Sequence, residues 1–248
     1  MFPDRPPQRF DPGEWGRIYD RPALTGGTFP FLRSAEMALD RCLAHSAPGE
    51  VWLDVGCGTG HLAAKISARG RRVVALDHDL QMAAAARVRT GRAGAATRLV
   101  AGAAERLPLA SESVDGVLAV SLLGCLPSAA GFLREAARVL RPGGRLIATF
   151  TNGSSLLLGL RARRPAATGD APSWMYRLYA PGEVRRELAV AGLRLVACRG
   201  YNFFVTAGDA LIPGARLARG LDWLGRLPLA RHLARNFVCV GRKASPAA

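Results

Sequence analysis

Two segments in the first third of the chain carry residues whose types and spacing suit nucleoside binding. The first, LDVGCGTG from Leu53 to Gly60, follows an apolar run and precedes a helical pattern. Its glycines let the backbone turn sharply and approach a ligand closely, while the N–H groups of the next helix face that ligand. The second is Asp77, which ends the next apolar run and can accept hydrogen bonds from ribose hydroxyls. Together they predict a nucleoside-binding site.

The histidines and cysteines near these segments are weaker candidates for chemistry. We interpret His61 and His78 as incidental loop or helix residues, and Cys57 and Cys125 as small packing residues rather than nucleophiles. The five cysteines and four histidines are scattered, with no C-x-x-C pair and no metal-ligand spacing. The sequence therefore predicts no metal site and a reducing compartment.

Short apolar runs alternate with helical patterns between residues 50 and 150, which indicates an α/β fold with a parallel sheet. The predicted strands are 51–55, 71–76, 97–101, 114–120, 145–150, 193–199 and 236–241. The predicted helices are 61–69, 80–90, 132–140 and one that begins at Pro181 and ends at Gly192, with a turn over 141–144. These elements place the glycine loop and Asp77 just past the first and second strands.

Four motifs in this region occur in the order and spacing of a known family. They are LDVGCGTG at 53–60, ALD at 75–77 with Met82 following, GAAERLPL at 102–109 with SVD at 113–115, and ARVLRPGG at 137–144. In these residues the chain resembles the class I S-adenosylmethionine (SAM)-dependent methyltransferases. The likeness is greatest to the small-molecule, type 11 enzymes of ubiquinone and menaquinone biosynthesis, and it covers residues 48 to 150.

The resemblance implies a fold and an activity. The fold is Rossmann-like, with a seven-stranded, mostly parallel sheet, helices on both faces, an antiparallel last strand and helical substrate-binding decorations. One methyltransferase domain would span residues 1–248, with an N-terminal helical cap (1–48), a SAM-binding core (49–150) and a C-terminal half with substrate-side insertions (151–248). The activity would be methyl transfer from SAM to a small, hydrophobic acceptor such as a quinone, a lipid or a secondary metabolite.

The resemblance also implies contacts to SAM from the first two motifs. Asp54 would orient the methionine amino group together with the backbone of the glycine loop. Asp77 would hold the ribose, with His78 beside it. The loop residues of the expected site are Gly56, Cys57, Gly58 and Gly60.

Further expected cofactor contacts lie later in the chain and at its start. Ala103 and Ala104 would lie along the adenine, although the family usually has Asp where Ala103 stands. Val120 and Ser121 would border the sulfonium, and Tyr19 would close over the cofactor as an N-terminal segment does in relatives.

No catalytic residue is predicted, because methyl transfer from a sulfonium is an in-line displacement that needs alignment and exclusion of water more than a base. Many relatives have His where Gly124 stands, so that route to proton handling is missing here. If the acceptor is a hydroxyl, the candidate bases are Tyr176, Tyr179 and Tyr201.

Two other functions within related folds are weighed on particular residues. Enzymes that methylate an exocyclic base amine have Asn or Asp followed by Pro-Pro after the fourth strand, whereas residues 121–124 are SLLG, which argues against a nucleic-acid acceptor. Nicotinamide-dependent oxidoreductases use G-x-G-x-x-G, whereas this loop is G-x-G-x-G. A catalytically inactive SAM-fold binding protein and an RNA methyltransferase stay open as alternatives.

The net charge of +15 is concentrated in the C-terminal part of the chain. Residues 1–150 carry 19 basic and 14 acidic side chains, and residues 151–248 carry 15 and 5. A positive field favours anionic partners, but 32 of the 34 basic residues are Arg, which biased coding alone would also produce.

Two features bear on location. Residues 1–10 have no apolar run behind them, and the uncharged stretch 116–133 contains Pro127 at its centre, so we expect no targeting peptide, no spanning helix and a cytoplasmic protein. Between Pro213 and Arg235, leucines at helical spacing alternate with arginines. This pattern fits either a helix lying peripherally on the inner, anionic face of the membrane or a lid helix packed on the domain.

Overall fold

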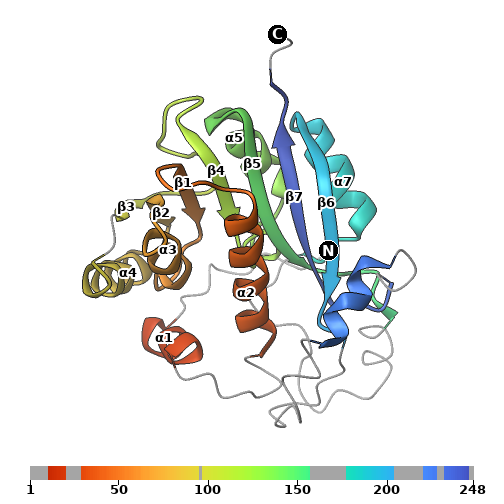
Figure 1. The fold of residues 1–248 in the computed structure, drawn as a ribbon, viewed down its shortest axis with the longest axis horizontal. Coiled ribbons are helices and arrows are strands. Elements are labelled where there is room, and N and C mark those ends of the chain that lie inside the picture. Colours follow the sequence, from red (N-terminus) through yellow and green to blue (C-terminus); the bar gives the residue numbers. More distant parts are fainter. Residues whose placement is uncertain are drawn as a thin grey trace.

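The computed structural model describes residues 11–20, 29–94, 97–156, 177–203, 220–227 and 232–245. A seven-stranded sheet runs through the middle of the molecule with helices on either side (Figure 1). The strands lie in the order β3-β2-β1-β4-β5-β7-β6. Their bounds are β1 Val51–Val55, β2 Arg72–Asp77, β3 Thr97–Ala101, β4 Val114–Ala119, β5 Leu140–Thr151, β6 Leu193–Tyr201 and β7 Asn236–Lys243.

The first five strands pair in parallel, and β7 pairs antiparallel with both β5 and β6. This arrangement confirms the expected Rossmann-like fold with an antiparallel last strand. Because parallel strands share one direction, the carboxyl ends of β1, β2 and β4 meet at the same edge of the sheet. That edge is where the glycine loop and Asp77 were expected to meet.

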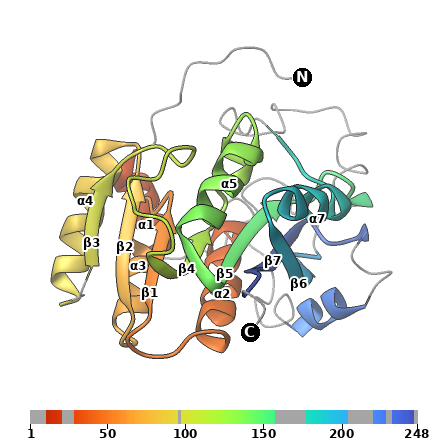
Figure 2. The same ribbon diagram turned by 90° about the horizontal axis from the view of Figure 1, so that it is seen from above.

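Helices cover both faces of the sheet, as expected (Figure 2). Residues of α5 and α7 pack into the hydrophobic core on one face, and residues of α2 and α3 pack into the core on the other. The helix bounds are α1 Pro12–Asp20, α2 Phe29–Ala44, α3 His61–Ser67, α4 Leu80–Arg92, α5 Ala129–Val139, α7 Pro181–Val190, and the short 3-10 helices η1 Leu123–Cys125 and η2 Asp222–Arg226. Helix α7 begins at Pro181 as predicted, and α1 and α2 lie within residues 1–48.

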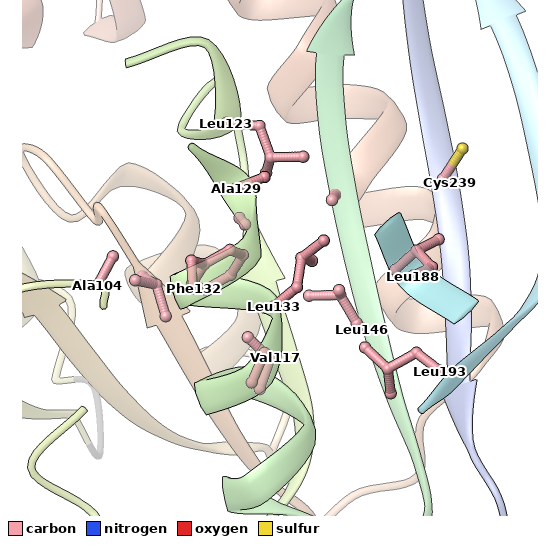
Figure 3. Close-up of a cluster of buried hydrophobic side chains, with 14 of the residues drawn as sticks. Ala104, Val117, Leu123, Ala129, Phe132, Leu133, Leu146, Leu188, Leu193 and Cys239 are labelled. Atoms are coloured by element: carbon pink, nitrogen blue, oxygen red, sulfur yellow. The ribbon is translucent and has the colours of Figure 1, made fainter. Parts of the chain in front are cut away.

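The central strand β4 shows why the sheet is buried on both sides. Val117 points into the core beneath α5, while Leu118 joins the opposite core beneath α2 and α3. Figure 3 shows Val117 beside Phe132 and Leu133 of α5 and close to Leu146 of β5. A strand with apolar residues on both faces has no side left for water, which accounts for the apolar run from Gly116 to Val120 in the sequence.

The fifth strand is longer than the predicted 145–150. It starts at Leu140, directly after α5, and Val114 pairs with Leu140 before the register shifts so that Gly116 pairs with Arg145. Gly143 adopts a φ of 77° within the shift. The residues predicted as a turn therefore form an irregularity inside an extended strand, because the conformational freedom of glycine accommodates the extra residues without ending the pairing.

Candidate functional site

A cavity opens at the carboxyl ends of β1, β2 and β4, where the loop after each strand contributes to its wall. It is lined by Trp15, Tyr19, Asp54, Gly56, Cys57, Gly58, Thr59, His61, Leu62, Asp77, His78, Met82, Val120, Ser121, Leu122 and Cys125. Crevices at this edge of an open α/β sheet are the usual ligand sites of the fold.

The glycine loop forms one wall of the cavity and is tied to the end of β2. The backbone N–H groups of Gly56 and Cys57 donate to the carbonyl oxygen of Leu76 over 2.8 and 3.0 Å. Gly56, Gly58 and Gly60 have φ values of 69°, 53° and 75°, in the left-handed region that favours glycine. The sequence LDVGCGTG therefore forms a compact turn whose shape depends on three glycines.

Asp77 fastens the loop from the other side. Its carboxylate oxygens accept hydrogen bonds from the backbone N–H of Gly58 at 2.8 Å and of Asp79 at 3.0 Å. The side chain of Asp77 is buried and lines the cavity, while His78 lies mostly exposed with Nδ1 3.5 Å from an Asp77 oxygen. Since each carboxylate oxygen has two lone pairs, Asp77 can hold the loop and still accept from a ligand.

Asp54, near the end of β1, is the acid in the cavity wall with the fewest hydrogen-bond partners for its buried oxygens. Its side chain is 2% exposed, and within the described part of the chain Oδ2 has no hydrogen-bond partner. Burial, and then the neighbouring charge of Asp77, raise the pKa of Asp54 to about 7, although the backbone N–H of Ala63 opposes this. A buried carboxylate oxygen without a partner is costly, and a positive group or a hydrogen-bond donor in the cavity would remove that cost.

Helix α1 covers the cavity from the N-terminal side with two aromatic residues. The ring of Tyr19 stacks on His61 with centroids 4.5 Å apart, and Trp15 lies 6.5 Å from Tyr19. Burial and the charge of Asp54 raise the pKa of Tyr19 to about 12, so its hydroxyl stays protonated at neutral pH. Tyr19, expected to close over the cofactor, thus lines the cavity, and no pattern in the sequence indicated its contact with His61.

The turn that follows β4 forms another wall of the cavity. Ser121 adopts a φ of 57°, which is uncommon for a residue with a side chain. Its backbone N–H donates to the Thr149 hydroxyl at 2.8 Å, and its carbonyl oxygen accepts from the Cys125 thiol at 3.3 Å. These bonds fix the strained turn at the cavity rim, a feature common at binding sites.

Nine of the twelve residues expected at the cofactor line this cavity. They are Tyr19, Asp54, Gly56, Cys57, Gly58, Asp77, His78, Val120 and Ser121. Gly60, Ala103 and Ala104 are not part of its lining. A Cβ on Gly60 would lie 3.0 Å from the backbone of Ala86, so Gly60 serves the approach of α4 to the loop.

Ala103 and Ala104 follow β3 and differ in environment. Ala103 is exposed, while Ala104 is buried in the core beneath α5, where Figure 3 shows it near Phe132. The lining residues that sequence reasoning did not assign to the site are Trp15, Thr59, His61, Leu62, Met82, Leu122 and Cys125. Most adjoin an assigned residue in the sequence, but only the folded chain brings α1 and the turn after β4 to the same cavity.

The tyrosines considered as bases lie elsewhere. Tyr201 is fully buried, and its hydroxyl is 2.7 Å from the Ser34 hydroxyl of α2. Tyr179 is buried against Phe150. Neither lines the cavity, and Tyr176 lies outside the described residues. Among the described side chains, no group of three or more His, Cys, Asp or Glu residues is arranged to hold a metal ion.

Comparisons with known proteins agree with this geometry. A family model described as a methyltransferase domain matches residues 53–148. A ubiquinone biosynthesis O-methyltransferase from Methylocella silvestris is 30% identical over 194 residues, which cover 74% of this chain and 71% of the relative. The chain belongs to the class I SAM-dependent methyltransferases. SAM is the methyl donor of this family.

Other relatives of this methyltransferase chain match over a shorter span. A malonyl-[acyl-carrier protein] O-methyltransferase from Pectobacterium atrosepticum is 42% identical over 125 residues, 49% of this chain and 46% of the relative. The chain spans about half the length of the first curated relatives that it matches. A SAM-dependent methyltransferase structure from Aquifex aeolicus shares the fold, with a TM-score of 0.60 and 19% identity over 94% of this chain and 99% of that one.

Proposed function

We propose that this chain transfers a methyl group from SAM to a small, hydrophobic acceptor such as a quinone, a lipid or a secondary metabolite. The observation that carries the proposal is a cavity lined by a buried acid, Asp54, whose Oδ2 has no partner among the described residues, by a second acid, Asp77, and by a glycine loop. SAM offers a positive amino group and a ribose diol, and the two acids suit them.

The residues present fit SAM on grounds of charge and hydrogen bonding. The free Oδ2 of Asp54 would accept from the methionine ammonium, which would supply the positive partner that this buried acid lacks. Asp77 would accept from the ribose hydroxyls with the lone pairs that its bonds to Gly58 and Asp79 leave unused. The Thr59 hydroxyl, also buried without a partner among the described residues, adds a further polar group to the same wall.

When bound, SAM supplies an electrophilic methyl group on a positive sulfur. The work of this chain is to orient that group, align an acceptor with it and keep water out. Leu122, Met82 and Cys125 provide apolar cavity wall, and the Tyr19–His61 stack covers it from the α1 side. The burial-raised pKa of Cys125, about 12, keeps that thiol protonated and unreactive.

The acceptor class rests on the relatives and on the absence of a nucleic-acid signal. Two of the relatives described above are named as O-methyltransferases, one of ubiquinone biosynthesis and one acting on a malonyl-[acyl-carrier protein]. We therefore favour an oxygen acceptor on a small or carrier-bound molecule. Labelled SAM incubated with the protein and a cell extract, followed by separation into lipid, small molecule, protein and RNA fractions, tests this choice, and label in RNA alone would overturn it.

Replacing Asp77 tests the cofactor assignment. We expect Asp77→Ala to weaken SAM binding more than tenfold in calorimetric titration, because a buried ribose would lose a charged acceptor whose hydrogen bonds stabilise by about 1.5–3 kcal/mol. Asp79→Ala is the matched control two residues away, since Asp79 accepts from Gln81 at 2.8 Å and caps α4. It should lower stability by about 1 kcal/mol and leave SAM affinity unchanged. Unchanged affinity in Asp77→Ala would contradict the assignment.

A further inference from the structure

Three arginines stand side by side at the end of the sheet opposite the cavity. In the strand register Arg145 of β5 pairs with Arg242 of β7, and Arg242 pairs with Arg194 of β6. Directly paired residues project from the same face of a sheet, and neighbouring strands lie about 4.8 Å apart. Arg145, Arg242 and Arg194 therefore form a row across three strands, which we call the arginine ladder. It lies toward the end where the chain leaves β7 at its C-terminus (Figure 1).

Little negative charge balances this ladder. Arg145 has Glu50 at 3.7 Å, whereas neither Arg194 nor Arg242 forms an ion pair with any residue that the structure describes. Both are exposed. Like charges placed directly opposite in a sheet are destabilising, so the ladder lowers the stability of this edge.

The end of α2 adds to the same positive field. Burial, and then the charges of Arg41 and Arg145, lower the pKa of His45, so this histidine is neutral at physiological pH. The Nε of Arg41 is buried and has no hydrogen-bond partner among the described residues. The positive charge at this end of the sheet therefore comes from three strands and from α2, and not from a single surface arginine.

The outer part of the ladder borders a pocket with three basic side chains and one hydroxyl in its lining. It is lined by Gly192, Arg194, Arg242, Lys243, Ala244 and Ser245. Above Gly143, the point where a Cβ would stand lies 3.7 Å from a terminal nitrogen of Arg242 and 3.2 Å from the Ser245 hydroxyl. The guanidinium and the hydroxyl therefore converge over a residue without a side chain. Lys243 is engaged elsewhere, with Glu112 at 3.2 Å and the Leu140 carbonyl at 2.8 Å.

We propose that the arginine ladder binds a ligand bearing two or more phosphate charges, as in a diphosphate or a phosphate monoester headgroup. Guanidinium groups present paired N–H donors that match phosphate oxygens and are easily desolvated, and the Ser245 hydroxyl adds a donor on the Arg242 side of the pocket. A doubly charged anion would also remove the repulsion between Arg194 and Arg242. This site is separate from the SAM cavity and does not depend on the proposed methyl transfer.

The test uses inorganic pyrophosphate as the probe and thermal unfolding as the measurement. At constant ionic strength, pyrophosphate should raise the Tm of the wild-type protein in a saturable way. The double variant Arg194→Gln with Arg242→Gln should have a higher Tm without ligand, because the repulsion is gone, and should need at least tenfold more pyrophosphate for the same increase. Arg98→Gln, an exposed arginine on β3 at the far edge of the sheet, is the matched control and should respond as the wild type does.

A higher Tm without ligand, together with a weaker response to pyrophosphate, in the double variant would identify a binding site. If the double variant gains stability but keeps the wild-type pyrophosphate response, the ladder is only a tolerated repulsion and the proposal fails. An equal loss in Arg98→Gln would show a general charge effect and would also overturn it. A second experiment identifies the source of the phosphate by measuring binding of the wild type and the double variant to vesicles of phosphatidic acid in phosphatidylcholine. Ladder-dependent binding to these vesicles supports a lipid headgroup, and pyrophosphate binding without it supports a free metabolite.

Discussion

At the scale of single residues, the cavity is defined by two acids that differ in how the fold satisfies them. Asp77 is anchored by two backbone N–H groups, whereas Asp54 has an oxygen without a partner among the described residues. A protein keeps such a buried charge at a cost in stability when a ligand removes the cost. Asp54 is therefore the residue whose behaviour should report most directly on ligand binding.

The raised pKa of Asp54 predicts a pH-dependent SAM affinity. With the free-protein pKa at about 7, binding of an ammonium group would favour the ionised form and lower that pKa. SAM affinity should then fall about tenfold between pH 8 and pH 6, and binding at pH 6.5 should release protons. Calorimetry in two buffers with different ionisation enthalpies measures this release. A pH-independent affinity would show that Asp54 does not hold the amino group.

The same pKa predicts how the stability of the protein without SAM changes with pH. The pKa of Asp54 is raised in the folded state from the ordinary 3.8, so the folded state binds more protons than the unfolded state between these values. The contribution of Asp54 to stability is therefore most favourable below about pH 4 and is lost as the pH rises toward 7. Asp54→Asn serves as the control: it should remove this dependence, raise the Tm at pH 8 and abolish the pH dependence of SAM binding.

At the scale of elements, the loop between β1 and α3 uses its glycines for different purposes. Nothing lies within 4 Å of the position of a Cβ on Gly58, which lines the cavity. A Cβ on Gly60 would meet the backbone of Ala86 in α4. Gly58 therefore leaves space for a ligand, while Gly60 allows two helices to approach.

Two alanine substitutions should separate these purposes. Gly58→Ala should cost about 1 kcal/mol through its positive φ and weaken SAM binding at least tenfold by filling the cavity wall. Gly60→Ala should cost more, about 1–3 kcal/mol, because strain and the Ala86 contact add. Below its Tm it should retain SAM affinity within about threefold. Urea unfolding and SAM titration of both variants give the comparison, and a greater affinity loss in Gly60→Ala would reverse the assignment.

At the scale of the whole molecule, no helix in the described ranges is long and apolar enough to cross a membrane. The side chains of Trp223 and Leu227, at η2, are 55% and 45% exposed, next to a strongly basic stretch of sequence. Exposed aromatic and aliphatic groups with flanking arginines suit contact with an anionic lipid surface. Arg219 and Arg231 of the sequence pattern lie outside the described residues, as does the side chain of Arg226.

Peripheral membrane contact remains a proposal with a direct test. We expect the protein to sediment with phosphatidylglycerol vesicles but not with phosphatidylcholine vesicles at low salt, and less so as salt rises, since each exposed basic residue contributes only about 1 kcal/mol. Replacing Arg219, Arg226 and Arg231 with Gln, or Trp223 with Ala, should reduce sedimentation, whereas Arg98→Gln should not. If the protein stays in the supernatant with both vesicle types, the membrane proposal is wrong. The lid-helix interpretation would then stand, and an acceptor dissolved in water would be favoured.

The sequence alone determined the order and type of the elements around the cofactor motifs, because a parallel strand buried on both faces is mostly apolar and a tight turn at its end favours glycine. For the same reason it placed Asp54, Asp77 and the glycine loop together at one edge of the sheet. These requirements are local, and a single segment of sequence can display them.

Only the tertiary structure decided which residues share a surface across distant segments. The contact of Tyr19 with His61, the bond from Ser121 to Thr149, and the register that aligns Arg145, Arg242 and Arg194 each join elements far apart in the chain. It also separated Gly60 and Ala104 from the cavity, although both lie within cofactor motifs. Packing between elements depends on where whole strands and helices come to rest, and no short pattern of residues encodes that.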